Sequence, residues 1–266
     1  YPLRRQRQMC IRDRYMENRR AKGFTVIQTV ILSELDGSDG INRPLINGSP
    51  STPDPDYFKW VDRVLEIAGE KGLYVGLLPT WGDKVDKQWG AGPEIFDEAN
   101  AREYGRWLGR RYADTPNIIW IIGGDRSGEG KNFTVWKAMA EGIKECDKRH
   151  LMAYHPQGEH SSSFWFHDET WLDFNMFQSG HAQRDYAIYR RLLLNDLQKQ
   201  PIKPVLDGEP RYENIPIDFK SENGRFDDFD VRMTLYQSMF SGACGYTYGC
   251  NEVWQMYSCL LYTSDA

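Results

Sequence analysis

The sequence has little that would place the protein in a membrane, on a nucleic acid or around a metal ion. Its apolar runs all fall short of the about 18–20 residues that a membrane-spanning helix needs. The net charge of −5 leaves no basic surface for nucleic acid or anionic lipid. The five histidines show neither an HxH nor an HExxH spacing. We therefore expect no metal and no cofactor, and neither nucleic acid nor membrane as a partner.

Cysteine is also scarce and irregularly placed. There are five cysteines, and none lies in a CxxC or a Cys/His metal-binding spacing. An odd number of cysteines without a pattern argues against a disulfide framework. Cysteine usage therefore leaves the compartment and the oligomeric state open.

Aromatic residues, in contrast, are abundant. The chain of 266 residues has nine Trp, fifteen Tyr and twelve Phe. This length fits one large domain with a sizeable core, which absorbs part of the aromatic content. The rest is compatible with a sugar-binding cleft, where flat aromatic faces are common.

The two ends of the chain do not look like parts of a folded domain. Residues 1–14 include five Arg and show no apolar periodicity, and residues 258–266 follow the last strand-like run abruptly. Both strings resemble translated sequencing-adapter read-through at the edges of a metagenomic reading frame. We expect both to be non-native tails that pack on nothing, with the natural segment at 15–257 cut at both ends.

Helical and strand-like patterns alternate between the two ends. We expect a helix at 15–22 and further helices at 56–71, 99–112, 133–148, 185–198 and 230–240. Seven strand-like runs begin near residues 24, 73, 117, 151, 173, 204 and 245. This pattern predicts an α/β fold of the (β/α)8 TIM-barrel class in one domain, with strand one and the final helix missing. A doubly wound open sheet is the alternative, but its glycine-rich phosphate fingerprint is absent.

Two carboxylates at the ends of buried strands carry most of the functional signal. Asp125 follows the run IIWIIGG, and Glu209 follows PVLDG. They are 84 residues apart, or 28 for each of three strand–helix units, so both would lie on the carboxyl-terminal rim where barrel enzymes catalyse. Two acids on one rim are the minimum for glycosidic-bond hydrolysis. The alternatives are a helix cap or an ion pair with Arg126 for Asp125, and an ion pair with Arg211 for Glu209. Asp207 and Glu213 are rivals of Glu209.

Further polar and aromatic residues would surround the two acids. Glu34 and Asp36 follow an early strand and are equally well explained as parts of a solvated loop. Trp81 is as well explained as a core residue, and His155 and His181 as structural histidines. The residues that we expect to contact the sugar are Trp81, His155, Gln157, Gln178, His181, Arg211, Tyr248, Asn251 and Trp254.

Several stretches together resemble the apiosidase-like glycoside hydrolases, glycoside hydrolase family 140. They are GFTVIQTVILSELDG (23–37), GLYVGLLPTWGDKV (72–85), YADTPNIIWIIGGDR (112–126), HPQG (155–158), MFQSGH (176–181), PVLDGEPRYE (204–213) and GYTYGCNEVWQMY (245–257). The resemblance implies a (β/α)8 domain that hydrolyses apiose linkages of pectic rhamnogalacturonan II. It implies Asp125 as acid/base and Glu209 as nucleophile, and a bacterial enzyme that is periplasmic or secreted when intact. The family's first strand and C-terminal β domain have no counterpart, which can leave this fragment inactive.

Other functions remain open. The same barrel could act on a different glycoside, since a fold does not fix a substrate. A catalytically inactive carbohydrate-binding barrel is a second possibility, but a binder would need neither acid. A metal-dependent amidohydrolase is disfavoured by the histidine spacing. For a hydrolase, we expect retention of anomeric configuration, with inversion as the alternative.

Overall fold

The computed structural model describes residues 13–34, 43–182 and 184–255. The chain divides between Ala153 and Tyr154 into two compact units. Among the described residues, no helix combines the length and the apolar character that crossing a bilayer requires.

The first unit is built on parallel strands. The sheet has the order β1-β2-β3-β4, and β1 pairs with β2 and β2 with β3 in parallel. All residues of β2 after the first are buried, as expected of a parallel strand covered on both faces. The strands are β1 Val26–Leu32, β2 Tyr74–Thr80, β3 Ile118–Arg126 and β4 Met152–Pro156, which ends in the second unit.

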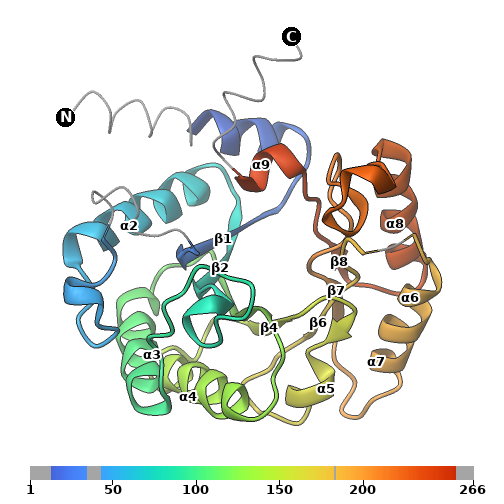
Figure 1. The fold of residues 1–266 in the computed structure, drawn as a ribbon. Helices are drawn as coiled ribbons and strands as arrows, with labels where there is room; N and C mark the ends of the chain where they lie inside the picture. Colours follow the sequence, from blue (N-terminus) through green and yellow to red (C-terminus); the bar gives the residue numbers. More distant parts are fainter. Residues whose placement is uncertain (1–12, 35–42, 183, 256–266) are drawn as a thin grey trace. The chain divides into compact units, whose positions relative to one another are not determined.

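Helices of the first unit lie along one side of this sheet (Figure 1). They are a helix at residues 13–21, α2 Pro55–Glu70, α3 Glu98–Tyr112 and α4 Lys131–Cys146. A separate short 3-10 turn, η2 Gly82–Lys84, follows β2. Asp54 and Asp97 cap α2 and α3 through their side chains. A Cβ on Gly105 of α3 would lie 2.3 Å from the Met139 carbonyl oxygen of α4. Glycine therefore lets the backbones of α3 and α4 touch.

The second unit has a smaller sheet, of order β5-β6-β7-β8. Its strands are β5 His160–Ser161, β6 Asn175–Gln178, β7 Val205–Asp207 and β8 Gly245–Tyr246. β5 pairs antiparallel with β6, and the other pairs are parallel. The helices of the second unit are α5 Ser163–Phe166, α6 Ala187–Tyr189, α7 Asn195–Leu197, α8 Asp228–Phe240 and α9 Asn251–Gln255; a π-helical turn at Arg190–Leu194 joins α6 to α7. Figure 1 shows α6, α7 and α8 on one side of these strands.

The seven predicted strands and the predicted helices are present, with two differences near the candidate site. Strand β3 continues through both glycines to Arg126, so Asp125 lies inside the strand rather than after it. The two-residue strand β5 was not predicted, because it is too short to show a pattern. Of the predicted tails, residues 1–12 and 258–266 lie outside the described residues. Asp13 is described and forms an ion pair with Lys71 at 3.0 Å.

Candidate active site

Glu209 is held by two histidines of the second unit. His155 is the penultimate residue of β4, His181 follows β6, and Glu209 lies two residues after β7. Nε2 of His155 is 2.9 Å from Oε2 of Glu209, and Nε2 of His181 is 3.1 Å from Oε1. All three side chains are buried. Each carboxylate oxygen therefore has its own imidazole.

These contacts decide the charge of Glu209. Burial alone would raise the pKa of its carboxyl, but the contacts with His155 and His181 outweigh burial and hold that pKa well below the ordinary 4.5. Glu209 is therefore a carboxylate at neutral pH. Such a group can attack an electrophilic carbon or take a proton. We expected His155 and His181 to contact sugar hydroxyls, whereas their Nε2 atoms contact this carboxylate.

Asp207, the first rival of Glu209, faces the interior. Its Oδ2 accepts hydrogen bonds from Ser179 Oγ at 3.0 Å and Ser238 Oγ at 3.2 Å. Burial, and to a smaller extent the charge of Glu209, raises the pKa of Asp207 to about 7. Its side chain is inaccessible to solvent, so a bulky substrate cannot reach it.

Glu213, the second rival, is held by the segment after β8. The Tyr248 hydroxyl donates to Oε2 of Glu213 at 2.6 Å. The Asn251 N–H donates to the Glu213 carbonyl oxygen at 2.9 Å, and the Glu213 N–H donates to the Gly249 carbonyl oxygen at 3.0 Å. Tyr248 and Asn251 therefore fix Glu213 in this structure.

Asp125 sits in an unusual backbone conformation near the end of β3. Its φ is +60°, in the left-handed region that few residues other than glycine adopt. The preceding Gly124 has a φ of +132°. A Cβ on Gly82 would lie 2.1 Å from the Gly124 carbonyl oxygen, so the turn after β2 presses directly against β3. The absence of a Cβ at Gly82 and Gly124 thus permits a backbone contact beside Asp125.

Two neighbours approach the Asp125 carboxyl. The Trp89 indole N–H donates to Oδ2 at 3.2 Å. Nη1 of Arg126 lies 3.8 Å from the same oxygen, and the same nitrogen donates to the Asp125 carbonyl oxygen at 2.7 Å. The proposed ion pair with Arg126 is therefore loose. Trp89 was missed by the sequence reasoning; its only signal was a tryptophan followed by glycine in the loop after a buried strand.

Trp81, Gln178 and Gln157 were also predicted to contact the sugar. Trp81 is half-buried, and its Cε3 would lie 3.0 Å from a Cβ on Gly124, beside Asp125. Gln178 is buried in β6 opposite His160. Nε2 of Gln157 lies 3.4 Å from Nε2 of His160.

Arg211 and Trp254 complete the predicted set. Arg211 is buried, with its guanidinium 4.5 Å from the ring centroid of Tyr186 and 5.3 Å from that of Phe226. It is therefore packed on aromatic rings. Trp254 belongs to α9, but its side chain lies outside what the structure describes.

The loop after β1 carries Glu34 and Asp36, which the sequence explained equally well as parts of a solvated loop. Oε1 of Glu34 accepts a hydrogen bond from the Ala91 N–H at 3.1 Å. Glu34 therefore holds the loop that carries Trp89, while Asp36 lies outside the described residues. Within the described residues, no group of three or more His, Cys, Asp or Glu side chains is placed to hold a metal ion.

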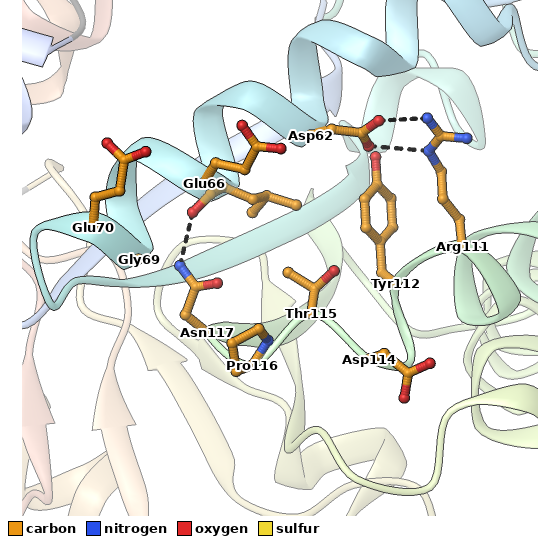
Figure 2. Close-up of a pocket in the computed structure, with 11 residues that line it drawn as sticks. Asp62, Glu66, Gly69, Glu70, Arg111, Tyr112, Asp114, Thr115, Pro116 and Asn117 are labelled. Carbon is orange, nitrogen blue, oxygen red and sulfur yellow. Dashed lines mark hydrogen bonds and ion pairs between the residues drawn. The ribbon is translucent and has the colours of Figure 1, made fainter.

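A depression of about 680 Å³ in the first unit lies away from these residues (Figure 2). Asn117, which comes just before β3, lines the depression, whereas Asp125 is near the other end of that strand. Asp62 and Arg111 form a two-pronged ion pair on its border, at 3.1 and 2.6 Å. The Asn117 side chain donates to the Leu65 carbonyl oxygen at 3.0 Å (Figure 2). None of the predicted catalytic or sugar-binding residues lines this depression.

Comparison with known proteins gives the family. The family model "Apiosidase-like, catalytic domain" matches residues 4–260. A solved glycoside hydrolase is 35% identical, with a TM-score of 0.80, over 94% of this chain and 60% of that one. A family 5 glycoside hydrolase from Bacteroides vulgatus is 34% identical, with a TM-score of 0.79, over 93% of this chain and 56% of that one. This chain thus spans less than two thirds of these relatives. A search of curated protein sequences gave no match.

More distant structures show the fold alone. The endoglucanase Cel5A of Pseudomonas stutzeri, solved with cellobiose, is 14% identical with a TM-score of 0.62, over 90% of this chain and 74% of that one. The fold is therefore the α/β, (β/α)8-type architecture of these glycoside hydrolases. With its family match over nearly the whole length, the chain belongs to the apiosidase-like catalytic domain family.

Proposed function

We propose that this protein is a glycoside hydrolase that cleaves apiose-containing linkages of the pectic polysaccharide rhamnogalacturonan II. The observation that carries the proposal is Glu209, a buried carboxylate kept ionised between His155 and His181. Membership of the apiosidase-like family supports apiose as the sugar released. The relative from Bacteroides vulgatus supports a bacterial source, and pectin degradation follows from the proposed substrate.

Glu209 acts as the nucleophile and Asp125 as the acid/base in a retaining mechanism. In the first step a Glu209 oxygen bonds to the anomeric carbon while the glycosidic C–O bond breaks. Asp125 gives its proton to the departing oxygen. In the second step a water oxygen bonds to the same carbon, the bond to Glu209 breaks, and Asp125 takes a proton from that water. One water is consumed, and both acids return to their starting states.

The surroundings of the two acids support this division of roles. A nucleophile must be ionised before it attacks, and the low pKa of Glu209 meets that need. An acid/base must be reached by the attacking water, whose proton it takes in the second step. The Asp125 side chain keeps 20% of its surface exposed, compared with 11% for Glu209. Asp125 is therefore the better placed of the two to regain a proton.

A second candidate is a glycosidase that acts on another glycoside. The same type of fold occurs in the Pseudomonas endoglucanase, which was solved with cellobiose. A third candidate, a sugar-binding barrel without catalysis, is disfavoured because both acids are retained.

Product analysis tests the proposed substrate. The purified protein is incubated with rhamnogalacturonan II and, separately, with cello-oligosaccharides, and the released sugars are separated by anion-exchange chromatography. We expect free apiose from the first and no product from the second. Release of glucose or cellobiose alone would favour the second candidate, a glycosidase that acts on another glycoside. Release of no sugar from either, with binding retained, would favour the third.

A further inference from the structure

Trp89 is an exposed tryptophan placed directly beside the proposed acid. It lies between η2 and α3, and 65% of its surface is accessible. Its indole N–H donates to Oδ2 of Asp125 at 3.2 Å. Ligand sites combine aromatic side chains with a few precisely placed polar groups, and Trp89 with Asp125 forms such a pair.

Arg126 supports the ring of Trp89. The guanidinium carbon lies 4.5 Å from the indole centroid, at the distance of a cation–π contact. Arg126 itself is fully buried. It donates to the carbonyl oxygens of Asp86 at 2.6 Å and Lys87 at 3.0 Å, which lie just before Trp89. Arg126 therefore fixes both the ring and the chain that carries it, while the high exposure of Trp89 leaves the opposite ring face to solvent.

Buried charges hold the rest of the Trp89 loop. Lys84 Nζ lies 3.2 Å from Asp83 Oδ2 and donates to the Gly92 carbonyl oxygen at 2.7 Å. The Gly92 N–H donates to the same Asp83 oxygen at 2.7 Å. Asp83 and Lys84 are both buried. These bonds join the two ends of the segment around Trp89, so its ring is positioned before a ligand arrives and little entropy is lost on binding.

We propose that the open face of Trp89 stacks on the sugar unit of the leaving-group side. The inference rests on the proposed function, because Asp125 must protonate the oxygen of that unit. Sugar rings present a face of C–H groups, which the electron-rich face of an indole attracts. The indole N–H also donates to Oδ2 of Asp125 and so holds the orientation of this carboxyl. Trp89 thus binds the leaving sugar and positions the acid.

Two substitutions separate these roles. Trp89→Phe keeps a stacking face but removes the N–H donor, whereas Trp89→Ala removes both. Phe240 is 86% exposed on α8, so Phe240→Ala is the matched control. With rhamnogalacturonan II as substrate, we expect Trp89→Ala to raise KM about tenfold and lower kcat, as loss of one aromatic contact implies. Trp89→Phe should change KM by less than about twofold while lowering kcat. Trp89→Ala kinetics equal to those of Phe240→Ala would overturn the inference.

A second measurement does not depend on turnover. The indole N–H resonance of Trp89 is identified in a ¹⁵N spectrum by its loss in Trp89→Phe. Asp125→Asn replaces the carboxyl acceptor by an amide with different hydrogen-bonding groups, so we expect this resonance to shift. In Glu209→Gln protein, the same resonance should shift again when oligosaccharides of rhamnogalacturonan II are added. An unmoved resonance in either experiment would reject the inference. Both shifts without apiose release by the wild-type protein would reject the proposed function alone.

Discussion

Asp207 and Glu209 are two residues apart and both buried, yet their surroundings move their pKa values in opposite directions. Burial raises the pKa of Asp207 to about 7, whereas the contacts with His155 and His181 outweigh burial and lower that of Glu209. One strand end therefore carries a readily protonated acid and a carboxylate that is ionised at neutral pH. Neighbouring carboxyl groups with divergent pKa values are typical of catalytic sites, where each carboxyl has a different role.

Glu209→Gln should abolish turnover on every substrate. The amide is nearly isosteric but cannot form the covalent intermediate, so we expect kcat to fall by about 10³-fold or more. Glu213→Gln is the control, because Glu213 is held by Tyr248 rather than by the histidines. Its kcat should stay within about tenfold of the wild type. Near-normal kcat in Glu209→Gln would mean that Glu213 is the nucleophile or that the proposed mechanism is wrong.

Asp125→Asn should be sensitive to the leaving group. Loss of a general acid typically costs about 10²–10⁴-fold. A nitrophenyl glycoside needs little protonation of its leaving oxygen, so its first step should be slowed much less than cleavage of the polysaccharide. The ratio of pre-steady-state rates on the two substrates measures this difference. Equal losses on both would exclude Asp125 as the acid.

His181→Asn should move the acidic limb of the pH profile. The contact with His181 helps to lower the pKa of Glu209, and removing it should let that pKa rise. Glu209 would then lose its charge at a higher pH, and the acidic limb of kcat/KM should move upward. His160→Asn is the control, since His160 contacts Gln157 and the Gly158 carbonyl oxygen instead. An unmoved limb would assign His181 a purely structural role.

Asp207→Asn should gain stability relative to the wild type as pH rises. The folded-state pKa of about 7 lies above the ordinary 3.8, so the folded protein holds the proton more tightly than the unfolded chain. Wild-type stability should therefore fall between about pH 4 and 7, whereas the neutral amide escapes this loss. Urea unfolding at pH 5 and at pH 8 gives the difference in unfolding free energy between Asp207→Asn and the wild type at each pH. Identical differences at both pH values would show that Asp207 does not titrate in this range.

Asp147 should contribute stability that acid removes. Burial raises its pKa, but hydrogen bonds from His150, from Trp120 and from two backbone N–H groups outweigh burial and lower it to about 2. This stabilisation is full above pH 3.8 and is lost as pH falls towards 2. Asp147→Asn should cost roughly 2 kcal/mol at pH 7. Asp114→Asn is the control, because that carboxylate is fully exposed beside Arg149. Equal melting temperatures for the two variants would contradict the prediction.

Most strands and helices were predictable, because buried strands such as the run before Gly123 are continuous apolar segments and helices such as α2 show a helical period. The short β5 and α5 show no such pattern, and neither was predicted. The partners of Glu209 were not predictable, since His155 and His181 are 54 and 28 residues away in sequence. Only the fold brings them to one carboxylate. Trp89 was missed for the same reason, because its contact with Asp125 spans 36 residues.

The roles of the two acids, the retaining stereochemistry and the non-native character of the tails stay predictions. Stereochemistry depends on the separation of the two carboxyls. An NMR spectrum of the first-formed anomer would decide it, because retention and inversion give opposite anomers.

The left-handed backbone of Asp125 also limits what can replace it. Asparagine and glycine adopt this conformation readily, whereas a β-branched residue at the same place would strain the strand. A lineage that gave up hydrolysis while keeping its affinity for sugars should therefore carry Asn or Gly at this position. One nucleotide change converts an Asp codon into either, so such lectin-like descendants would lie a single mutational step from the enzyme.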